Sequence, residues 1–207
     1  MKVYDHDIRE ILHRDFCQYE DFIKTPTIVI DEMDICAGRS RIDIAVVNGK
    51  MHGYEIKSKQ DTLERLPRQV EDYNKIFDTM TLVVFENHLD KVYELIPAWW
   101  SVKSVSEKNS KIFITTRREG KMNTHLDIDS IVLLLWRDEM INILMMYTDV
   151  RKGYKSKTRK QLGELLTSNI EREQIPLIVR EQLKLRKSWR AAVIQQQDGD
   201  CTRMLPN

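Results

Sequence analysis

The segment Arg41–Lys57 constrains the fold of this chain most strongly, because it reads as two strands joined by a tight turn. Side chains alternate between the two faces of a strand, so residues two positions apart share a face. On this spacing Ile42 and Ile44 lie on one face of the first strand, and Tyr54 and Ile56 lie on one face of the second. The segment therefore predicts a β-hairpin that buries these four side chains together.

The turn decides whether the two apolar faces coincide. Asn48-Gly49 would ordinarily form a two-residue turn. That register would pair Asp43 with Tyr54 and put the apolar faces on opposite sides of the sheet. A three-residue loop, Val47–Gly49 with its glycine in the left-handed conformation, brings the apolar faces together. It also makes Asp43 and Glu55 diagonal neighbours on the other face.

Asp43, Glu55 and Lys57 on this polar face are the groups that a Mg²⁺-dependent phosphodiester hydrolase needs. Carboxylate oxygens hold the hard cation, and the cation polarises a phosphate oxygen and lowers the pKa of a bound water. Lys57 can orient that water and stabilise charge on the phosphate. The alternative interpretation is a half-buried hairpin whose polar side chains are simply solvated.

The predicted order of elements, αβββαβ, resembles the PD-(D/E)XK nuclease superfamily, with Asp43 on the second strand and Glu55-x-Lys57 on the third. Gln69 and Tyr73 stand one helical turn apart on the next predicted helix and therefore share a face. They match the Gln-x-x-x-Tyr motif of the RecB-like branch. The resemblance implies that both side chains line the cleft and contact the metal-bound water, the lysine or the DNA strand.

The resemblance extends over most of the chain. Ile42 stands where the superfamily name has proline, a departure that many members share. The segments GYEIKSKQDTLERLPRQVEDYNKIFD, PAWW, LLWRDE and KLRKSWR also resemble a little-characterised bacterial family of nuclease-like proteins within it. The resemblance implies an α/β fold with a restriction-endonuclease-like core, in which a mixed central sheet is flanked by helices. It also implies DNA hydrolysis with one or two Mg²⁺, for which Mn²⁺ should substitute, and the backbone carbonyl of Ile56 as a further metal ligand.

A third acid is expected near the metal, because the superfamily often supplies one from its first helix or first strand. Glu32 is the first candidate, since acids at this place precede a Gly-Arg-x-x-Arg-x-Asp run in the resembling family. Strand alternation puts Glu32 on the face of Ile28 and Ile30, unless the strand bulges or ends there. Glu10, on the predicted first helix, is the second candidate.

The net charge of +1 hides an asymmetry between the two parts of the chain. From Arg151 onward there are thirteen Lys and Arg against six Asp and Glu, which suits a protein that docks a polyanion. Arg41 and Arg65 could clamp phosphate or pair with Glu55 or Asp61, and the basic helices could be solvated faces. The predicted nucleic-acid contacts are Arg41, Arg65, Lys157, Arg159, Lys160, Lys184, Arg186, Lys187 and Arg190.

Two parts are expected, a nuclease-like core over 1–120 and a helical, basic subdomain over 121–207 packed on it. Trp99 and Trp100 are interpreted as packing residues rather than a base-stacking platform. Periodicity and turn residues predict the elements of both parts. The predicted helices are 5–16, 67–77, 90–96, 130–147, 157–166 and 176–189, and the strands outside the hairpin are 27–35, 81–85, 99–105 and 111–116.

Composition narrows the functional classes further. No apolar run reaches membrane length, and charges from the second residue leave no signal-peptide core. The three cysteines show no pairing or zinc pattern and fit reduced thiols in a cytoplasm. We therefore expect a cytoplasmic protein that acts on DNA, with a possible homodimer, no membrane contact and no small-molecule cofactor. The alternatives are a nuclease-fold module that binds nucleic acid or a partner protein without cutting, and an interaction protein that grips a partner through its C-terminal helices.

Overall fold

The computed structural model describes residues 4–149, 153–186, 191–197 and 200–204. Its strands are β1 (Thr27–Ile35), β2 (Ser40–Val47), β3 (Met51–Lys57), β4 (Thr79–Phe85), β5 (Ser101–Lys108), β6 (Lys111–Arg118), β7 (Ala191–Gln197) and β8 (Asp200–Met204). Its helices are α1 (Asp5–Phe16), α2 (Glu20–Lys24), α3 (Leu66–Ile76), α4 (Leu89–Leu95), α5 (Ile128–Val132), α6 (Arg137–Tyr147), α7 (Arg159–Asn169) and α8 (Ile175–Lys184). Short 3₁₀ turns lie at η1 (Cys36–Gly38), η2 (Glu86–His88) and η3 (Tyr154–Ser156).

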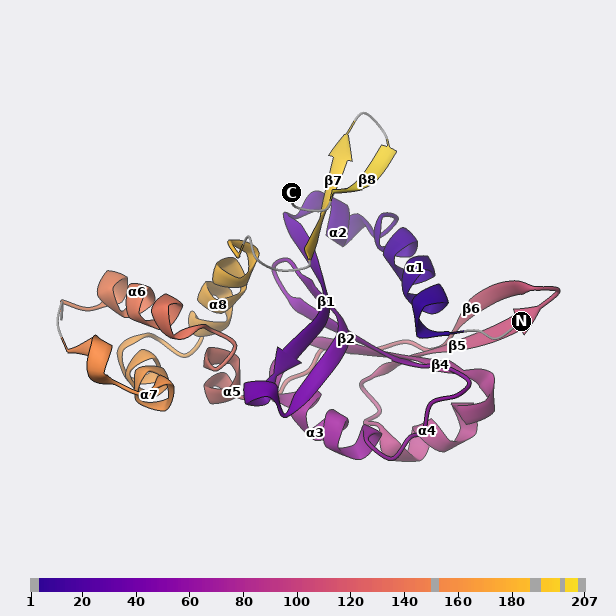
Figure 1. The fold of residues 1–207 in the computed structure, drawn as a ribbon, viewed down its shortest axis with the longest axis horizontal. Helices are drawn as coiled ribbons and strands as arrows, with labels where there is room; N and C mark the ends of the chain where they lie inside the picture. Colours follow the sequence, from indigo (N-terminus) through magenta and orange to yellow (C-terminus); the bar gives the residue numbers. More distant parts are fainter. Residues whose placement is uncertain (1–3, 150–152, 187–190, 198–199, 205–207) are drawn as a thin grey trace.

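The eight strands form one mixed sheet in the order β6-β5-β4-β3-β2-β1-β7-β8. β3, β4 and β5 are parallel to one another, and the other neighbours are antiparallel. Helices α1 and α2 lie on one side of the sheet, α3 and α4 lie on the other, and α5–α8 form a group beside it (Figure 1). The predicted α/β class, the mixed sheet flanked by helices and the inner position of β4 are confirmed.

Both faces of the hairpin β2–β3 are covered, so the alternative interpretation, a half-buried hairpin with a solvated polar face, does not hold. Ile44, Tyr54 and Ile56 pack with α1 in one apolar cluster, as expected. The opposite face carries Ala45 and Val47, which belong to a second cluster that includes α3 and α5–α8. The face that was predicted to be polar is therefore mostly part of the apolar core. Its two acids, Asp43 and Glu55, lie at the edge of that core.

Ile42 departs from the predicted face. It pairs with Met33, and both join the α3 cluster rather than the α1 cluster. The cause lies in β1, where Glu32 has a φ of 55° and interrupts the regular alternation of the strand. A break in the regular strand at Glu32, the condition for moving its side chain off the apolar face, is therefore present.

The hairpin loop has three residues, as predicted, but it is shifted by one position. Val47 pairs with Met51, so the loop is Asn48–Lys50. Gly49 is not left-handed, which corrects the prediction. The Asn48 side-chain oxygen accepts a hydrogen bond from the Lys50 amide at 2.8 Å and stabilises the turn instead. The shift preserves the alternation, and Asp43 and Glu55 stand on facing strands one residue beyond the last pair, Ile44 with Tyr54.

The second half of the chain differs from prediction in two places. The helix predicted over 130–147 is two helices, α5 and α6, because the chain turns at Trp136, whose amide donates to Glu139 at 2.6 Å. Strands β7 and β8 were not predicted; β7 pairs with Thr27–Ile30 of β1. The last predicted residues of the helix 176–189 fall partly outside the described residues, and α8 ends at Lys184.

The helices α5–α8 are joined to the sheet by apolar packing and by one buried ion pair. The α3 cluster is continuous from the sheet into Leu135, Leu162 and Val179. Arg180 of α8 donates to both carboxylate oxygens of buried Asp78, at 2.9 and 2.8 Å. The predicted packing of the later helices on the core thus has a specific polar contact as well as an apolar one.

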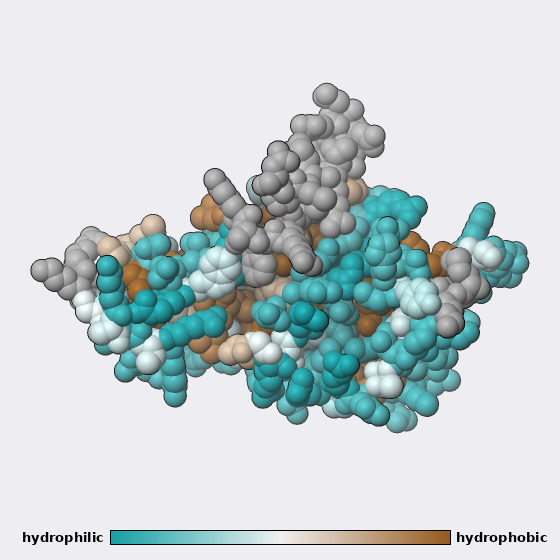
Figure 2. All heavy atoms as spheres, viewed as in Figure 1, coloured by the Kyte–Doolittle hydropathy of each residue, from teal (hydrophilic) through white to brown (hydrophobic). Residues whose placement is uncertain are grey.

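The visible surface is mainly hydrophilic, with apolar residues showing among α5–α8 (Figure 2). Within the ranges described above, no helix is both long and apolar enough to cross a membrane.

Candidate active site

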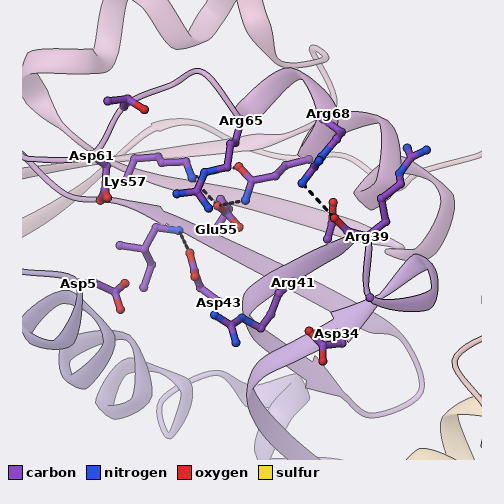
Figure 3. Close-up of a pocket in the computed structure, with 15 residues that line it drawn as sticks. Asp5, Asp34, Arg39, Arg41, Asp43, Glu55, Lys57, Asp61, Arg65 and Arg68 are labelled. Carbon is purple, nitrogen blue, oxygen red and sulfur yellow. Dashed lines mark hydrogen bonds and ion pairs between the residues drawn. The ribbon is translucent and has the colours of Figure 1, made fainter.

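Asp43, Glu55, Lys57 and Gln69 line one pocket of about 420 Å³, where the hairpin meets α3. Figure 3 shows the two acids and the lysine pointing toward a common space, with arginines around its rim. The structure therefore brings together, from three separate elements, side chains that were predicted to form one site.

Glu55 is buried, and three donors fix its carboxylate. Its Oε1 atom accepts hydrogen bonds from Lys57 Nζ at 2.6 Å and from Gln69 Nε2 at 2.7 Å. Its Oε2 atom lies 2.7 Å from the Tyr73 hydroxyl. Gln69 Oε1 also accepts from Lys57 Nζ at 3.1 Å, so α3 holds both the acid and the lysine in place.

Tyr73 lies beneath the pocket rather than in it, because its side chain is fully buried. Its hydroxyl can donate its single proton to Glu55 or to the backbone carbonyl oxygen of Arg41, which lies at 2.8 Å. Burial, together with the negative charge of Glu55, raises the pKa of Tyr73, so the hydroxyl stays protonated. Tyr73 therefore supports Glu55 and links α3 to β2, and direct contact with DNA, one of the predicted roles, does not fit its position.

Asp43 faces Glu55 across the pocket and is held by backbone. Its Oδ2 atom accepts a hydrogen bond from the Ile56 amide at 2.7 Å (Figure 3). Burial and the nearby Glu55 carboxylate raise the pKa of Asp43 to about 8, and the Ile56 hydrogen bond only partly opposes them. Arg9 of α1 approaches from the other side, with Nη1 2.5 Å from the Asp43 carbonyl oxygen and Nη2 3.8 Å from Oδ1.

The donor groups fit a hard divalent cation. Asp43 and Glu55 offer carboxylate oxygens, Ile56 lines the same pocket, and Mg²⁺ prefers carboxylate and carbonyl oxygen ligands. Burial first, and the Glu55 carboxylate second, raise the pKa of Asp43, and a bound cation would favour its charged form. Across the described residues no three His, Cys, Asp or Glu side chains converge as a metal site, so water would have to supply the remaining ligands.

The structure brings neither predicted third acid to the pocket. The exposed Glu32 carboxylate lies 3.7 Å from Arg41 and lines a neighbouring hollow. The exposed Glu10 carboxylate lies 3.6 Å from His6. Glu32 has a positive φ and does not line the pocket, contrary to the expectation that it completes the metal site.

Asp5 and Asp34 line the pocket in place of those two acids. Asp34 follows the bend at Glu32, so strand alternation alone could not have identified it. Asp5 lies in the first turn of α1, where an acid is ordinarily interpreted as stabilising the helix dipole. Its side chain pairs with Arg9 at 2.8 Å.

Four arginines line the pocket with Lys57. Arg41 and Arg65 were predicted, whereas Arg39 and Arg68 were not. Arg39 is fixed by the fully buried Asp72 of α3, to which it donates through Nε at 2.9 Å and through Nη2. Burial alone would raise the pKa of Asp72, but hydrogen bonds from Arg39 and Ser40 hold it below its usual value. A spacing signal could not have revealed this pair, because the two residues come from distant segments.

The basic residues predicted on the later helices do not converge on this pocket. Arg186 is buried, and its Nε and Nη2 donate to Glu139 at 2.6 and 2.5 Å. Arg159 donates to the carbonyl oxygens of Leu135 and Leu133. Both guanidinium groups therefore stabilise α5–α8, which corrects their assignment to phosphate.

The remaining predicted cations stand as follows. Lys184 pairs with Glu181 at 2.6 Å. Lys157 is half-buried and Lys160 is exposed, and both lie near the start of α7, away from the residues that line the pocket. Lys187 and Arg190 lie outside the described residues.

Comparisons with known proteins place most of the chain in one family. The family described as "Bacteriophage P4 protein cII" matches residues 14–200. The curated "Protein cII" of Enterobacteria phage P4 is 23% identical over 168 residues, which are 81% of this chain and 62% of that relative. The chain thus spans less than two thirds of the relative's length. No solved structure matches the chain.

Proposed function

The chain belongs to the bacteriophage P4 protein cII family, and we propose that it is a divalent-metal-dependent nuclease that hydrolyses DNA phosphodiester bonds. The observation that supports this most directly is the constellation of Asp43, Glu55 and Lys57 in one pocket, with Gln69 and Tyr73 bonded to Glu55. We further propose that α1, β1–β3, α3 and β4 correspond to the restriction-endonuclease-like core of the PD-(D/E)XK superfamily.

Asp43 and Glu55, with the carbonyl of Ile56, would hold the cation. When bound, Mg²⁺ polarises a phosphate oxygen and lowers the pKa of a coordinated water. Glu55 is suited to this role, because a carboxylate offers about four acceptor positions and three donors already fix its orientation. Tyr73 keeps Glu55 in place from below, and the Ile56 amide does the same for Asp43.

Lys57 would orient the attacking water and stabilise charge on the scissile phosphate. Its ammonium group is held between Glu55 Oε1 and Gln69 Oε1, so it is positioned before substrate arrives. Water would attack phosphorus in line with the bond to the 3′ oxygen, and that bond would break to leave a 5′-phosphate and a 3′-hydroxyl. Arg41 and Arg65 line the rim and can donate bidentate hydrogen bonds to the flanking phosphates.

The test is a cleavage assay on linear, circular, single-stranded and branched DNA with Mg²⁺, with Mn²⁺ and with chelator. Glu55→Gln and Lys57→Ala should each slow cleavage by about a hundredfold or more, because each removes a group preorganised toward the reacting phosphate. Glu10→Gln is the matched control, since Glu10 is an acid of α1 that lies outside the pocket. Cleavage by E55Q or K57A at the parent rate would show that the assigned chemistry is wrong.

One observation favours the rival, a nuclease-fold module that binds without cutting. Glu55 and Lys57 are paired directly at 2.6 Å, a contact that also serves a purely structural site. Calorimetric titration with Mn²⁺ separates the two. Metal binding that E55Q abolishes supports the nuclease, whereas no heat of binding at millimolar metal supports the rival.

A further inference from the structure

A second hollow of about 440 Å³ adjoins the candidate active site, between the end of β1 and the helices α5–α8. The two hollows share Asp34 and Gly38, so they meet at the η1 turn. Figure 1 shows α5 beside this end of the sheet. A nucleic-acid strand lying in the first hollow can therefore continue into the second, which we call the Trp136 pocket.

Trp136 gives this pocket an aromatic surface. The residue precedes α6 and is 50% exposed. The Arg186 guanidinium lies over the indole ring, 4.3 Å from its centroid. A half-exposed indole against a cation is a common partner for stacking, because every nucleobase has a π face and the cation strengthens the contact.

The guanidinium that lies over the indole is itself fixed by hydrogen bonds. Arg186 is fixed by Glu139 and by the Leu134 carbonyl oxygen, to which its Nη2 donates at 2.7 Å. Glu139 in turn accepts from the Trp136 amide at 2.6 Å. A platform whose orientation is already fixed loses little conformational entropy on binding, and so retains more of the stacking energy.

The rest of the lining favours a base over a phosphate. Met33, Leu133 and Leu134 supply apolar surface, which suits a flat uncharged ring. The two arginines of the lining are already engaged, Arg186 by Glu139 and Arg159 by a backbone carbonyl oxygen. The carboxylates of Glu32 and Asp34, which also line the pocket, can accept hydrogen bonds from base amino groups.

We propose that the Trp136 pocket binds an unpaired nucleobase of the same strand whose phosphate lies in the active-site pocket. The inference rests on the proposed function and adds a substrate class to it, namely single-stranded nucleic acid. A base within a duplex is stacked and paired, so it cannot enter such a hollow without leaving the helix. The face of Trp136 acts as a stacking surface and the floor of the pocket excludes water from the base.

The experiment measures binding of a fluorescently labelled single-stranded DNA oligomer in EDTA, where cleavage cannot interfere. The oligomer is compared with a series in which one base at a time is replaced by an abasic site. For the parent protein we expect one position at which base removal weakens binding about tenfold, the scale of one stacking contact. Trp136→Ala should bind the intact oligomer about tenfold more weakly and be insensitive to that abasic site.

Two further variants make the result specific. Phe113→Ala removes another half-exposed aromatic, on β6 and outside both pockets, and should behave as the parent does. Trp136→Phe preserves an aromatic surface and should retain part of the abasic effect. Tryptophan fluorescence should be quenched on oligomer binding in the parent and less so in W136F, a readout that holds even if W136A is unstable.

The inference is overturned if W136A and the parent respond alike to every abasic site, or if W136F is quenched as fully as the parent. That failure is distinct from failure of the nuclease proposal. The nuclease proposal depends on loss of Mg²⁺-dependent cleavage in E55Q, which does not involve Trp136.

Discussion

The arginines of the candidate active site and those of α5–α8 show that one residue type serves two opposite purposes. Arg41 and Arg65 are exposed at the rim of a pocket, where an anionic ligand can reach them. Arg180 and Arg186 are directed inward and form ion pairs with Asp78 and Glu139. The segment with the larger excess of positive charge thus uses its best-placed arginines to hold the fold. The number of basic residues predicted nucleic-acid contacts in this segment, but these arginines are directed inward and are held by acids.

The largest effect on stability is expected at Arg186. Arg186→Ala leaves the buried Glu139 carboxylate without its bidentate partner and should lower the free energy of unfolding by about 4 kcal/mol. Urea denaturation followed by circular dichroism measures this. A loss below about 1 kcal/mol would place Arg186 among ordinary surface cations and remove the contrast between the two groups.

Arg180→Ala should have the next largest effect and lower the free energy of unfolding by about 3 kcal/mol. The substitution leaves buried Asp78 without its ion-pair partner between α8 and the hairpin loop. The double variant Arg180→Ala with Asp78→Ala should recover part of the loss, because the unpaired charge is then gone. Equal losses in the single and double variants would show that the two residues do not act as a pair.

Arg39 both lines the pocket and forms an ion pair with buried Asp72, whose pKa it holds below the usual value. The loss of stability caused by Arg39→Ala should therefore depend on pH. A carboxylate with a depressed folded pKa contributes stability above its unfolded value, near 4, and loses it as pH falls through the folded value. Arg39→Ala should therefore destabilise the protein at pH 7 and do so less at pH 3. Denaturation curves of parent and variant at both pH values measure the difference in stability between them. The same difference at pH 7 and at pH 3 would contradict the pairing of Arg39 with Asp72.

The rim arginines should have the smallest effect on folding and a clear effect on binding. Arg41→Ala and Arg65→Ala should each change stability by less than about 0.5 kcal/mol. Each should weaken DNA binding and reduce the slope of log affinity against log salt by about 1. Anisotropy titrations across a salt series give this slope, and Lys160→Ala on α7 is the control that should leave it unaltered.

The central residues of the site could be predicted from the sequence because their placement follows from short residue spacings along single strands and helices. Alternation in β2 and β3 placed Asp43 and Glu55 on one face, and the four-residue spacing of Gln69 and Tyr73 placed both toward Glu55. These patterns depend only on local backbone geometry, so they survived the one-residue error in the loop. The helix 5–16 and the strand 27–35 were also predicted with the bounds that the structure has.

What was missed depends on contacts between distant segments or on an unusual backbone conformation. Asp34 lines the pocket and Glu32 does not, at a place where Glu32 gives β1 a positive φ. The break before α6 had no ordinary start signal, since Trp136 has no side-chain oxygen to cap the helix. Strand β7 has its partner near the beginning of the chain, and its AAVIQQQ sequence lacks the apolar alternation of a half-buried strand.

The pairing of β7 with β1 has a practical consequence. Without residues 191–197, the amides and carbonyls of Thr27–Ile30 would stand open on one flank of the sheet, beside an apolar stretch of β1. Such a flank invites pairing with the same flank of another molecule. Shortened chains that stop after α8 are therefore expected to associate and precipitate, even though every residue of the candidate active site is still in them.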